Sequence, residues 1–262
     1  MNEVTIIIPT IGRNYLEKVL NSLFADLEYI REIIVINDSG KTLFLDRFNL
    51  YKDVYKLVKC IDTKGRRGAS FARNLGLENV QGDYVAFADD DDPWISGRLG
   101  SQLLIMKTEG LRASVCLDSG NAKSIRWQGR ESPLDFLYTD KGIRRHQRFL
   151  PFGTLVFHRE TYLGHKFSEE ISEREDLLFM NSLYIMNDHF AQVPIIGISV
   201  KREVWRSIRR PSFEDDFQWF RILQEHNKSI AKNFLLYIAI RNSVVGLQPR
   251  KAFKLIKVLL SL

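Results

Sequence analysis

The chain has 262 residues, of which 45% are hydrophobic and 27% are charged, and its formal net charge is +6. These values are ordinary for a soluble globular protein, and the longest apolar runs, such as 234–240, are too short to span a bilayer. The length favours one α/β domain with a C-terminal extension over two equal domains. The first residues lead straight into a predicted strand, without the charged leader and apolar segment of a secretory signal. Cys60 and Cys116 lie in predicted strands and are expected to be buried free thiols, so we expect a cytoplasmic protein.

The N-terminal part alternates between strand and helix patterns. Runs of β-branched and apolar residues predict strands over 4–8, 33–36, 56–61 and 84–88. Helical spacing of apolar residues predicts helices over 15–27 and 69–78. Strands separated by helices indicate an α/β fold with a doubly wound, Rossmann-like, mostly parallel sheet. The carboxyl ends of its strands would bring Thr10, Asp38 and Asp89 to Asp92 to one edge, where open α/β sheets bind ligands.

The pattern is looser in the C-terminal part. Strands are predicted over 113–117 and 154–157, and helices over 132–138, 173–186, 213–225, 230–245 and 250–260. We expect one unit over residues 1–211, with halves at 1–117 and 118–211, and a helical extension over 212–262. The last predicted helix is basic and amphipathic. It either packs against its own domain, which is the commoner outcome, or lies on an anionic membrane.

Four consecutive aspartates, Asp89 to Asp92, directly follow the predicted strand 84–88. Acidic runs are usually solvated loops. Here the run ends a buried strand, where crowded carboxylates repel one another unless a cation holds them together. Mg²⁺ or Mn²⁺ suits such oxygen ligands, and a cation with open coordination positions commonly binds a substrate diphosphate. The acidic site on a basic protein therefore suits a polyanionic substrate bridged by metal.

Four sequence blocks follow one another in a specific order. They are VTIIIPT at 4–10 with Gly12 and Arg13 after it, IIVINDSG at 33–40, GASFARNLG at 68–76 and GDYVAFADDDDPW at 82–94. Together they resemble the family 2 glycosyltransferases, strongly over 4–99 and weakly beyond. The resemblance implies the GT-A fold and the transfer of a sugar from a nucleotide-diphosphate sugar. Residues 1–117 would then form the nucleotide-sugar-binding half and residues 118–211 the acceptor half.

The resemblance also implies roles on the donor side. Pro9 and Thr10 would lie along the nucleotide, and Asp38 would accept a hydrogen bond from the base. A carboxylate acceptor suits the imide N–H of uracil, which favours a UDP-sugar. The alternative is that Asp38 is a simple turn residue. Arg73 would contact phosphate or ribose oxygens, and a capping or salt-bridging arginine is the alternative.

The acidic run resembles the DXD motif of the family. Aligned as Asp89-Asp90-Asp91, it makes Asp91 the ligand of Mn²⁺ or Mg²⁺, while Asp89 or Asp90 would hold ribose or the sugar. An alignment shifted to 90–92 stays open. The metal would neutralise charge that develops on the departing diphosphate.

Glu175 and Asp176 resemble the Glu-Asp pair that begins a helix in the acceptor half of the family's site. Asp176 would deprotonate the acceptor hydroxyl, which is too weak an acid to ionise alone at neutral pH. Glu175 is the second candidate. Acidic residues are also favoured in the first turn of a helix without any catalytic role. The resemblance implies inversion of configuration, which the residues themselves do not establish.

The resemblance therefore implies a glycosyltransferase that adds a sugar to a glycan or lipid-linked oligosaccharide in bacterial surface polysaccharide or lipopolysaccharide assembly. Such an enzyme would act in the cytoplasm, with peripheral contact to the inner face of the cell membrane as an option. One alternative is a nucleotidyltransferase that uses Mg²⁺ and a nucleoside triphosphate. Another is a non-catalytic module that binds nucleotide sugars or glycans. No nucleic acid partner is expected, because only the net charge suggests one.

Overall fold

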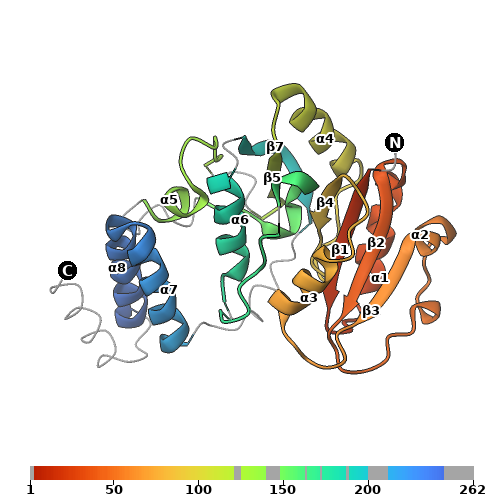
Figure 1. Cartoon of the computed structure of the whole chain (residues 1–262), viewed down its shortest axis with the longest axis horizontal. Coiled ribbons are helices and arrows are strands. Elements are labelled where there is room, and N and C mark those ends of the chain that lie inside the picture. The colour runs from red at the N-terminus through yellow and green to blue at the C-terminus, as the bar shows by residue number, and fades with distance from the viewer. Residues whose placement is uncertain are drawn as a thin grey trace.

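The computed structural model describes residues 3–120, 125–139, 148–162, 164–171, 173–186, 189–199 and 212–244. A seven-stranded sheet runs through it between two layers of helices (Figure 1). The strands are β1 (Val4–Thr10), β2 (Ile30–Asn37), β3 (Val58–Asp62), β4 (Tyr84–Phe87), β5 (Ala113–Asp118), β6 (Val156–His158) and β7 (Phe190–Ile198). The α-helices are α1 (Leu16–Ser22), α2 (Lys52–Leu57), α3 (Ala69–Leu77), α4 (Arg98–Glu109), α5 (Pro133–Tyr138), α6 (Glu175–Met186), α7 (Phe213–His226) and α8 (Lys228–Val244).

The sheet is mostly parallel, as predicted. Its strand order is β3-β2-β1-β4-β6-β5-β7, and β1 to β4 pair in parallel. Strand β6 runs antiparallel between β4 and β5. The residues that precede β6 therefore lie beyond the carboxyl end of β4. This topology brings the turn before β6 next to the acidic run that follows β4.

Each face of the sheet has its own hydrophobic core. Helices α1, α2 and α4 pack on one face around Ile6, Ile8 and Val35. Helices α3, α5, α6, α7 and α8 share the core on the other face with Ile7 and Phe87. Alternate strand residues point to opposite faces, so the apolar runs supply both cores at once. Helix α3 approaches β1 closely because Gly76 has no side chain where a Cβ atom would overlap Ile7.

Several predicted boundaries were wrong. The helix predicted over 15–27 is α1 followed by a 3₁₀ helix, Leu23–Tyr29. The strand predicted from residue 56 begins at Val58, because Lys52–Leu57 form α2. Cys60 is exposed rather than buried, because it lies on the edge strand β3, whereas Cys116 is buried as predicted. Helix α4 and strand β7 were not predicted.

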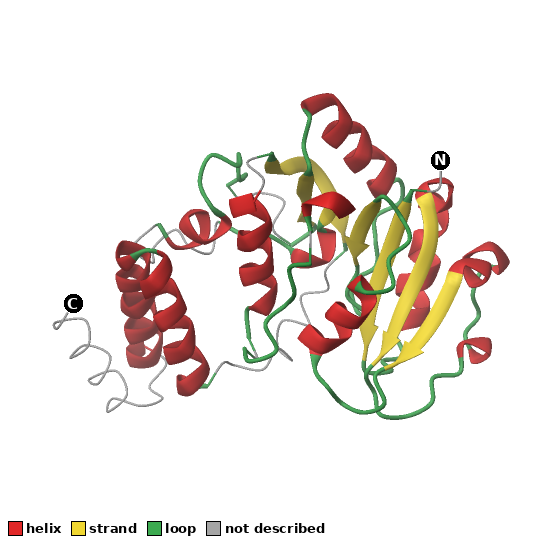
Figure 2. Cartoon of the chain, viewed as in Figure 1, coloured by secondary structure: helices red, strands yellow, loops and turns green. Residues whose placement is uncertain are grey.

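The helical extension forms an antiparallel pair at one end of the molecule, away from β1 to β3 (Figure 2). Helices α7 and α8 pack on α5 and join the core that contains α6. No helix in the described part of the chain is long and apolar enough to cross a bilayer. The basic helix predicted over 250–260 lies outside the described residues. The division into units 1–211 and 212–262 stays a prediction.

Candidate active site

The carboxyl ends of β1, β2 and β4 meet at one edge of the sheet, as predicted. The Thr10 hydroxyl at the end of β1 donates a 2.6 Å hydrogen bond to the Asp90 carboxylate beyond β4. The backbone N–H of Asp38 donates to the Thr10 carbonyl at 2.7 Å. Pro9 pairs with Ile36 in the same parallel ladder. Parallel register thus places residues that are far apart in sequence within one hydrogen-bonded group.

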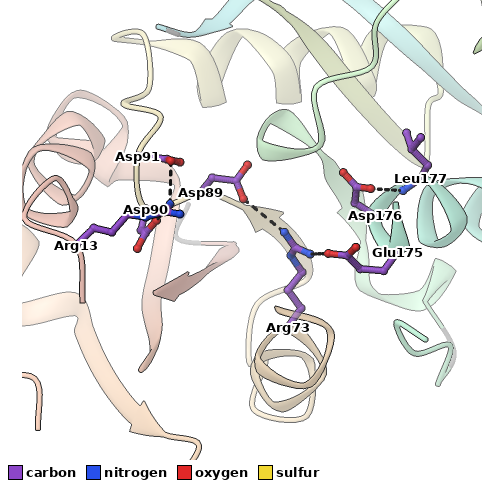
Figure 3. Close-up of polar contacts among 8 residues, drawn as sticks. All are labelled: Arg13, Arg73, Asp89, Asp90, Asp91, Glu175, Asp176 and Leu177. Carbon is purple, nitrogen blue, oxygen red and sulfur yellow. Dashed lines mark hydrogen bonds and ion pairs between the residues drawn. The ribbon is translucent and has the colours of Figure 1, made fainter. Parts of the chain in front are cut away.

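Two guanidinium groups bind the acidic run (Figure 3). Arg13, in the loop after β1, donates from Nη1 to Asp90 at 2.6 Å and to Asp91 at 2.8 Å. Arg73, on α3, lies 3.5 Å from Asp89. Among the described residues, no cationic side chain lies within ion-pairing distance of Asp92. The run therefore carries more negative charge than its two arginines neutralise.

The excess negative charge affects how these carboxyl groups ionise. Burial, followed by repulsion from Asp89 and Asp91, raises the pKa of Asp92 to about 7. Burial is also the main cause that raises the pKa of Asp89 and of Asp91. A group that loses solvation beside like charges holds its proton more tightly. A further cation beside these carboxyl groups would lower the electrostatic cost of ionising them.

The acidic run fits a divalent cation in its chemistry. The described part of the chain contains no group of three or more His, Cys, Asp or Glu side chains that could by themselves hold a metal ion. Mg²⁺ does not need such a cage, because it commonly uses one or two carboxylates together with substrate phosphates and water. The incompletely neutralised carboxylates beside Asp91 meet that requirement.

Arg73 joins the acidic run to the start of α6. Its Nη1 lies 2.7 Å from Glu175, and the guanidinium carbon lies 4.6 Å from the centre of the Phe152 ring. The predicted alternative of a salt-bridging arginine therefore describes the contacts of Arg73, while a contact with phosphate stays a prediction. The Nε of Arg73 is buried and has no hydrogen-bond partner among the described residues. Arg73 thus spans the two halves of the predicted site.

Asp176 follows Glu175 at the start of α6 and lies near Arg73 and Asp89 (Figure 3). Its carboxylate accepts a 2.7 Å hydrogen bond from the backbone N–H of Leu177. Burial, followed by repulsion from Glu175, raises the pKa of Asp176 to about 6. A carboxyl group with this pKa is largely ionised at neutral pH and still basic enough to take a proton.

Asp38 organises the loop that precedes α3. Its Oδ1 accepts hydrogen bonds from the Thr63 hydroxyl and from the backbone N–H of Arg67, both at 2.7 Å. Its Oδ2 accepts a 2.9 Å bond from the backbone N–H of Gly68, whose φ of +93° favours glycine. Asp38 therefore holds the loop that precedes α3, and its role as a turn residue before Ser39 and Gly40 stays a prediction. The role in binding a base stays a prediction.

A pocket of about 340 Å³ lies beside Asn37, which directly precedes Asp38 in the chain. It lies at the carboxyl ends of β2 and β3, and its lining includes two glycines and two lysines. The lining residues are Asn37, Gly40, Lys41, Thr42, Asp62, Lys64 and Gly65. The size suits a nucleoside-sized group.

Sequence reasoning missed three contributors to this site. It included Arg13 in a motif without giving it the carboxylate contacts. It did not identify Gly153, where a Cβ atom would lie 2.8 Å from an Asp89 oxygen. It also did not identify Arg174, which has a φ of +67° directly before Glu175. Gly12 and Arg13, which follow the first sequence block, were the one signal that the sequence offered. The roles of Gly153 and Arg174 depend on tertiary structure.

Comparison with known proteins identifies the family. The model of "Glycosyl transferase family 2" matches residues 5–164, which is more than half of the chain. The chain belongs to glycosyl transferase family 2. It is therefore an enzyme, and membership in the family favours a glycosyltransferase over the nucleotidyltransferase and over the non-catalytic module. Dependence on a divalent metal is typical of the family.

Three bacterial relatives are glycosyltransferases by name. TuaG of Bacillus subtilis (strain 168), named as a teichuronic acid biosynthesis glycosyltransferase, is 26% identical over 223 residues, which cover 80% of this chain and 86% of TuaG. The GalNAc(5)-diNAcBac-PP-undecaprenol beta-1,3-glucosyltransferase of Campylobacter jejuni is 30% identical over 189 residues, or 69% of this chain and 60% of that enzyme. WfaP of Escherichia coli, a UDP-Glc:alpha-D-GlcNAc-diphosphoundecaprenol beta-1,3-glucosyltransferase, is 37% identical over 78 residues, 30% of each chain.

Solved structures confirm the GT-A fold. Residues 1–349 of TarS from S. aureus, in complex with UDP, superpose with a TM-score of 0.66 at 16% identity, covering 92% of this chain and 72% of that one. The mannosyltransferase PcManGT from Pyrobaculum calidifontis, in complex with GDP-Man and Mn²⁺, has a TM-score of 0.58 at 18% identity. The match covers 98% of this chain and 79% of that one.

Proposed function

We propose that this enzyme transfers a sugar from a UDP-sugar to a hydroxyl of a lipid-linked glycan in bacterial surface polysaccharide assembly, with Mn²⁺ or Mg²⁺. The observation that carries the proposal is the position of Arg73. It contacts Asp89 in the acidic run and Glu175 beside Asp176, so a donor-binding and an acceptor-activating group lie on either side of one guanidinium. The names of WfaP and of the Campylobacter jejuni enzyme support a lipid-linked acceptor.

The proposed donor site extends from the pocket beside Asn37 to the acidic run. Asp38 Oδ2 accepts one hydrogen bond, from Gly68, so it can accept another from the imide N–H of uracil. Pro9 and Thr10 lie along the nucleotide, and Arg73 contacts phosphate or ribose oxygens. The UDP-Glc in the name of WfaP supports the choice of uracil.

In the proposed site Asp91 holds the metal, and Asp89 or Asp90 holds ribose or the sugar. The bound metal supplies Lewis-acid stabilisation of the negative charge on the diphosphate. Arg13 and Arg73 provide further positive charge at the same edge of the sheet. Asp90 is buried and bonded to Thr10, so β1 fixes its orientation.

Asp176 acts as the base in the proposed reaction. It removes the proton from the acceptor hydroxyl while the oxygen of that hydroxyl forms a bond to the anomeric carbon. The bond between the anomeric carbon and the diphosphate oxygen breaks, and UDP leaves with both electrons of that bond. Attack from the side opposite the diphosphate inverts the configuration, and the chain needs no covalent intermediate.

A transfer assay tests this proposal. The whole chain is incubated with Mn²⁺, a panel of UDP-, GDP-, CDP- and dTDP-sugars, and an undecaprenyl-diphosphate-linked sugar, and glycolipid products are analysed by mass spectrometry. We expect product with a UDP-sugar, and we expect Asp176→Asn to lower its formation by about a thousandfold. Transfer from another nucleotide sugar alone would reject the donor assignment, and an active Asp176→Asn variant would reject the base.

A further inference from the structure

Arg174, directly before the proposed base, has an unusual backbone conformation. Its φ of +67° lies in the left-handed region, which Arg174 and Lys64 alone among the described non-glycine residues occupy. Its carbonyl accepts a hydrogen bond from the N–H of Leu178 in the first turn of α6 at 3.2 Å. A residue at the N-cap of a helix more often has an extended conformation. Such backbone strain persists only where the surrounding structure holds it.

The helical extension holds the Arg174 side chain. Nη2 lies 2.8 Å from Oδ1 of Asp216, in the first turn of α7, and the Asp216 carboxylate is 2% exposed. The guanidinium carbon lies 5.7 Å from the Trp219 ring on α7 and 5.3 Å from the Phe234 ring on α8. Arginine stacks on aromatic faces and pairs with carboxylates at the same time, so three side chains from two helices fix one arginine.

The extension is connected to α5 by a hydrogen bond and by ring contacts. Trp219 donates from its indole N–H to the hydroxyl of Tyr138 on α5 at 3.1 Å. The Tyr138 ring packs edge-on against Phe234, with 5.5 Å between ring centres. The capping box of Ser212 and Asp215 orders the first turn of α7, where Asp216 lies. Asp216 is thus presented to Arg174 from a fixed frame.

We infer that Arg174 and Asp216 are positioning residues for the acceptor base. The ion pair fixes the backbone of Arg174, and this backbone sets the direction in which Glu175 and Asp176 enter the site. The helical extension therefore supports catalysis from outside the sheet. The inference rests on the proposed role of Asp176.

Asp216→Asn tests the inference, because it removes the charge and keeps the shape. Asp135→Asn is the matched control: Asp135 on α5 pairs with His226 on α7 at 3.4 Å, at the opposite end of α7 from Asp216. With the whole chain and Mn²⁺, we expect Asp216→Asn to lower kcat roughly ten- to a hundredfold, since small displacements of a catalytic group have effects of this size. We expect the KM for the donor to stay within about twofold of wild type, because Asp216 lies on α7, outside the set of residues proposed to bind the donor. The Asp135→Asn variant should retain wild-type kcat.

Arg174→Gly separates the side chain from the backbone, because glycine adopts the left-handed conformation without strain. Loss of kcat in this variant shows that the ion pair, and not the φ value alone, positions Asp176. Wild-type kcat in Asp216→Asn overturns the inference, and so does an equal loss of kcat in Asp135→Asn.

Hydrogen exchange distinguishes failure of this inference from failure of the proposed function. We expect the amides of residues 175–178 to exchange faster in Asp216→Asn than in wild type, and to be unchanged in Asp135→Asn. This readout needs no substrate, so it holds even if the wild-type chain transfers no sugar from a UDP-sugar. Unchanged exchange at 175–178 in Asp216→Asn also overturns the inference.

Discussion

Arg13 occupies the carboxylates that the proposal assigns to donor and metal. We predict that Arg13→Gln raises the affinity for Mn²⁺ in the absence of nucleotide by about tenfold, because two charge-assisted hydrogen bonds no longer compete with the ion. Isothermal titration of Mn²⁺ or its electron paramagnetic resonance signal measures this affinity. Lys18→Gln is the control, since Lys18 lies over the Tyr15 ring and the substitution changes the net charge equally. Equal affinities in the two variants would contradict competition by Arg13.

The raised pKa of Asp176 gives the reaction a defined pH dependence. A base must be deprotonated, so we predict that kcat rises with pH along an acid limb whose midpoint lies no lower than about 6. With this pKa about a tenth of Asp176 is ionised at pH 5 and about nine tenths at pH 7. Steady-state rates over a range of about pH 4.5 to 8 with saturating donor measure this profile.

A second variant identifies the group that titrates. Glu175 raises the pKa of Asp176 by charge repulsion, so Glu175→Gln should move the acid limb of the profile to lower pH. A limb that stays in place would show that another group controls the rate.

At the scale of elements, the closeness of α3 to β1 determines where Arg73 lies. We predict that Gly76→Ala lowers the free energy of unfolding by about 1–3 kcal/mol, because the new methyl group overlaps the buried Ile7. Urea denaturation followed by circular dichroism measures the change. Leu104→Ala on α4, where the side chain is 63% exposed, should change stability by less than about 0.5 kcal/mol. Similar losses in both variants would contradict the close packing of α3.

The sequence predicts the βα units well because their signals are local. Strands β1, β2 and β4 are β-branched or apolar runs that end at turn residues, and their parallel order follows from the helices between them. Helix α4 gives no such signal, because it begins after Gly97, which has a φ of +73° and no capping side chain. Strand β7 contains Pro194 and Gly197, which interrupt a strand pattern.

In the candidate site, too, the sequence predicts what local signals mark and misses what depends on tertiary contacts. Thr10, Asp38 and the acidic run could be predicted together, since each ends a parallel strand. The contacts of Arg13, Gly153 and Arg174 could not, because each joins segments that only the folded chain brings together. Asp38 was predicted as either a base-binding or a turn residue, and its bonds to the loop before α3 became visible only in the structure.

At the scale of the whole molecule, donor and metal should bind as a unit. We predict that UDP with Mn²⁺ raises the melting temperature, by an amount equivalent to about 2.7 kcal/mol when UDP is at a hundred times its Kd. Asp91→Ala should lose the part of this shift that requires Mn²⁺ and keep the melting temperature of the free protein close to that of wild type. Differential scanning fluorimetry with UDP, Mn²⁺ and both together measures it. A full shift in Asp91→Ala would reject Asp91 as the metal ligand.

Arg73 touches one carboxylate in each half of the site, and this has a kinetic consequence. A donor diphosphate that draws the guanidinium towards the acidic run would weaken its bond to Glu175. The negative charge at the start of α6 would then be less neutralised, and the basicity of Asp176 would rise after the donor has bound. Activation of the acceptor would follow donor binding, so we expect compulsory-order kinetics in which the sugar nucleotide enters first and UDP leaves last.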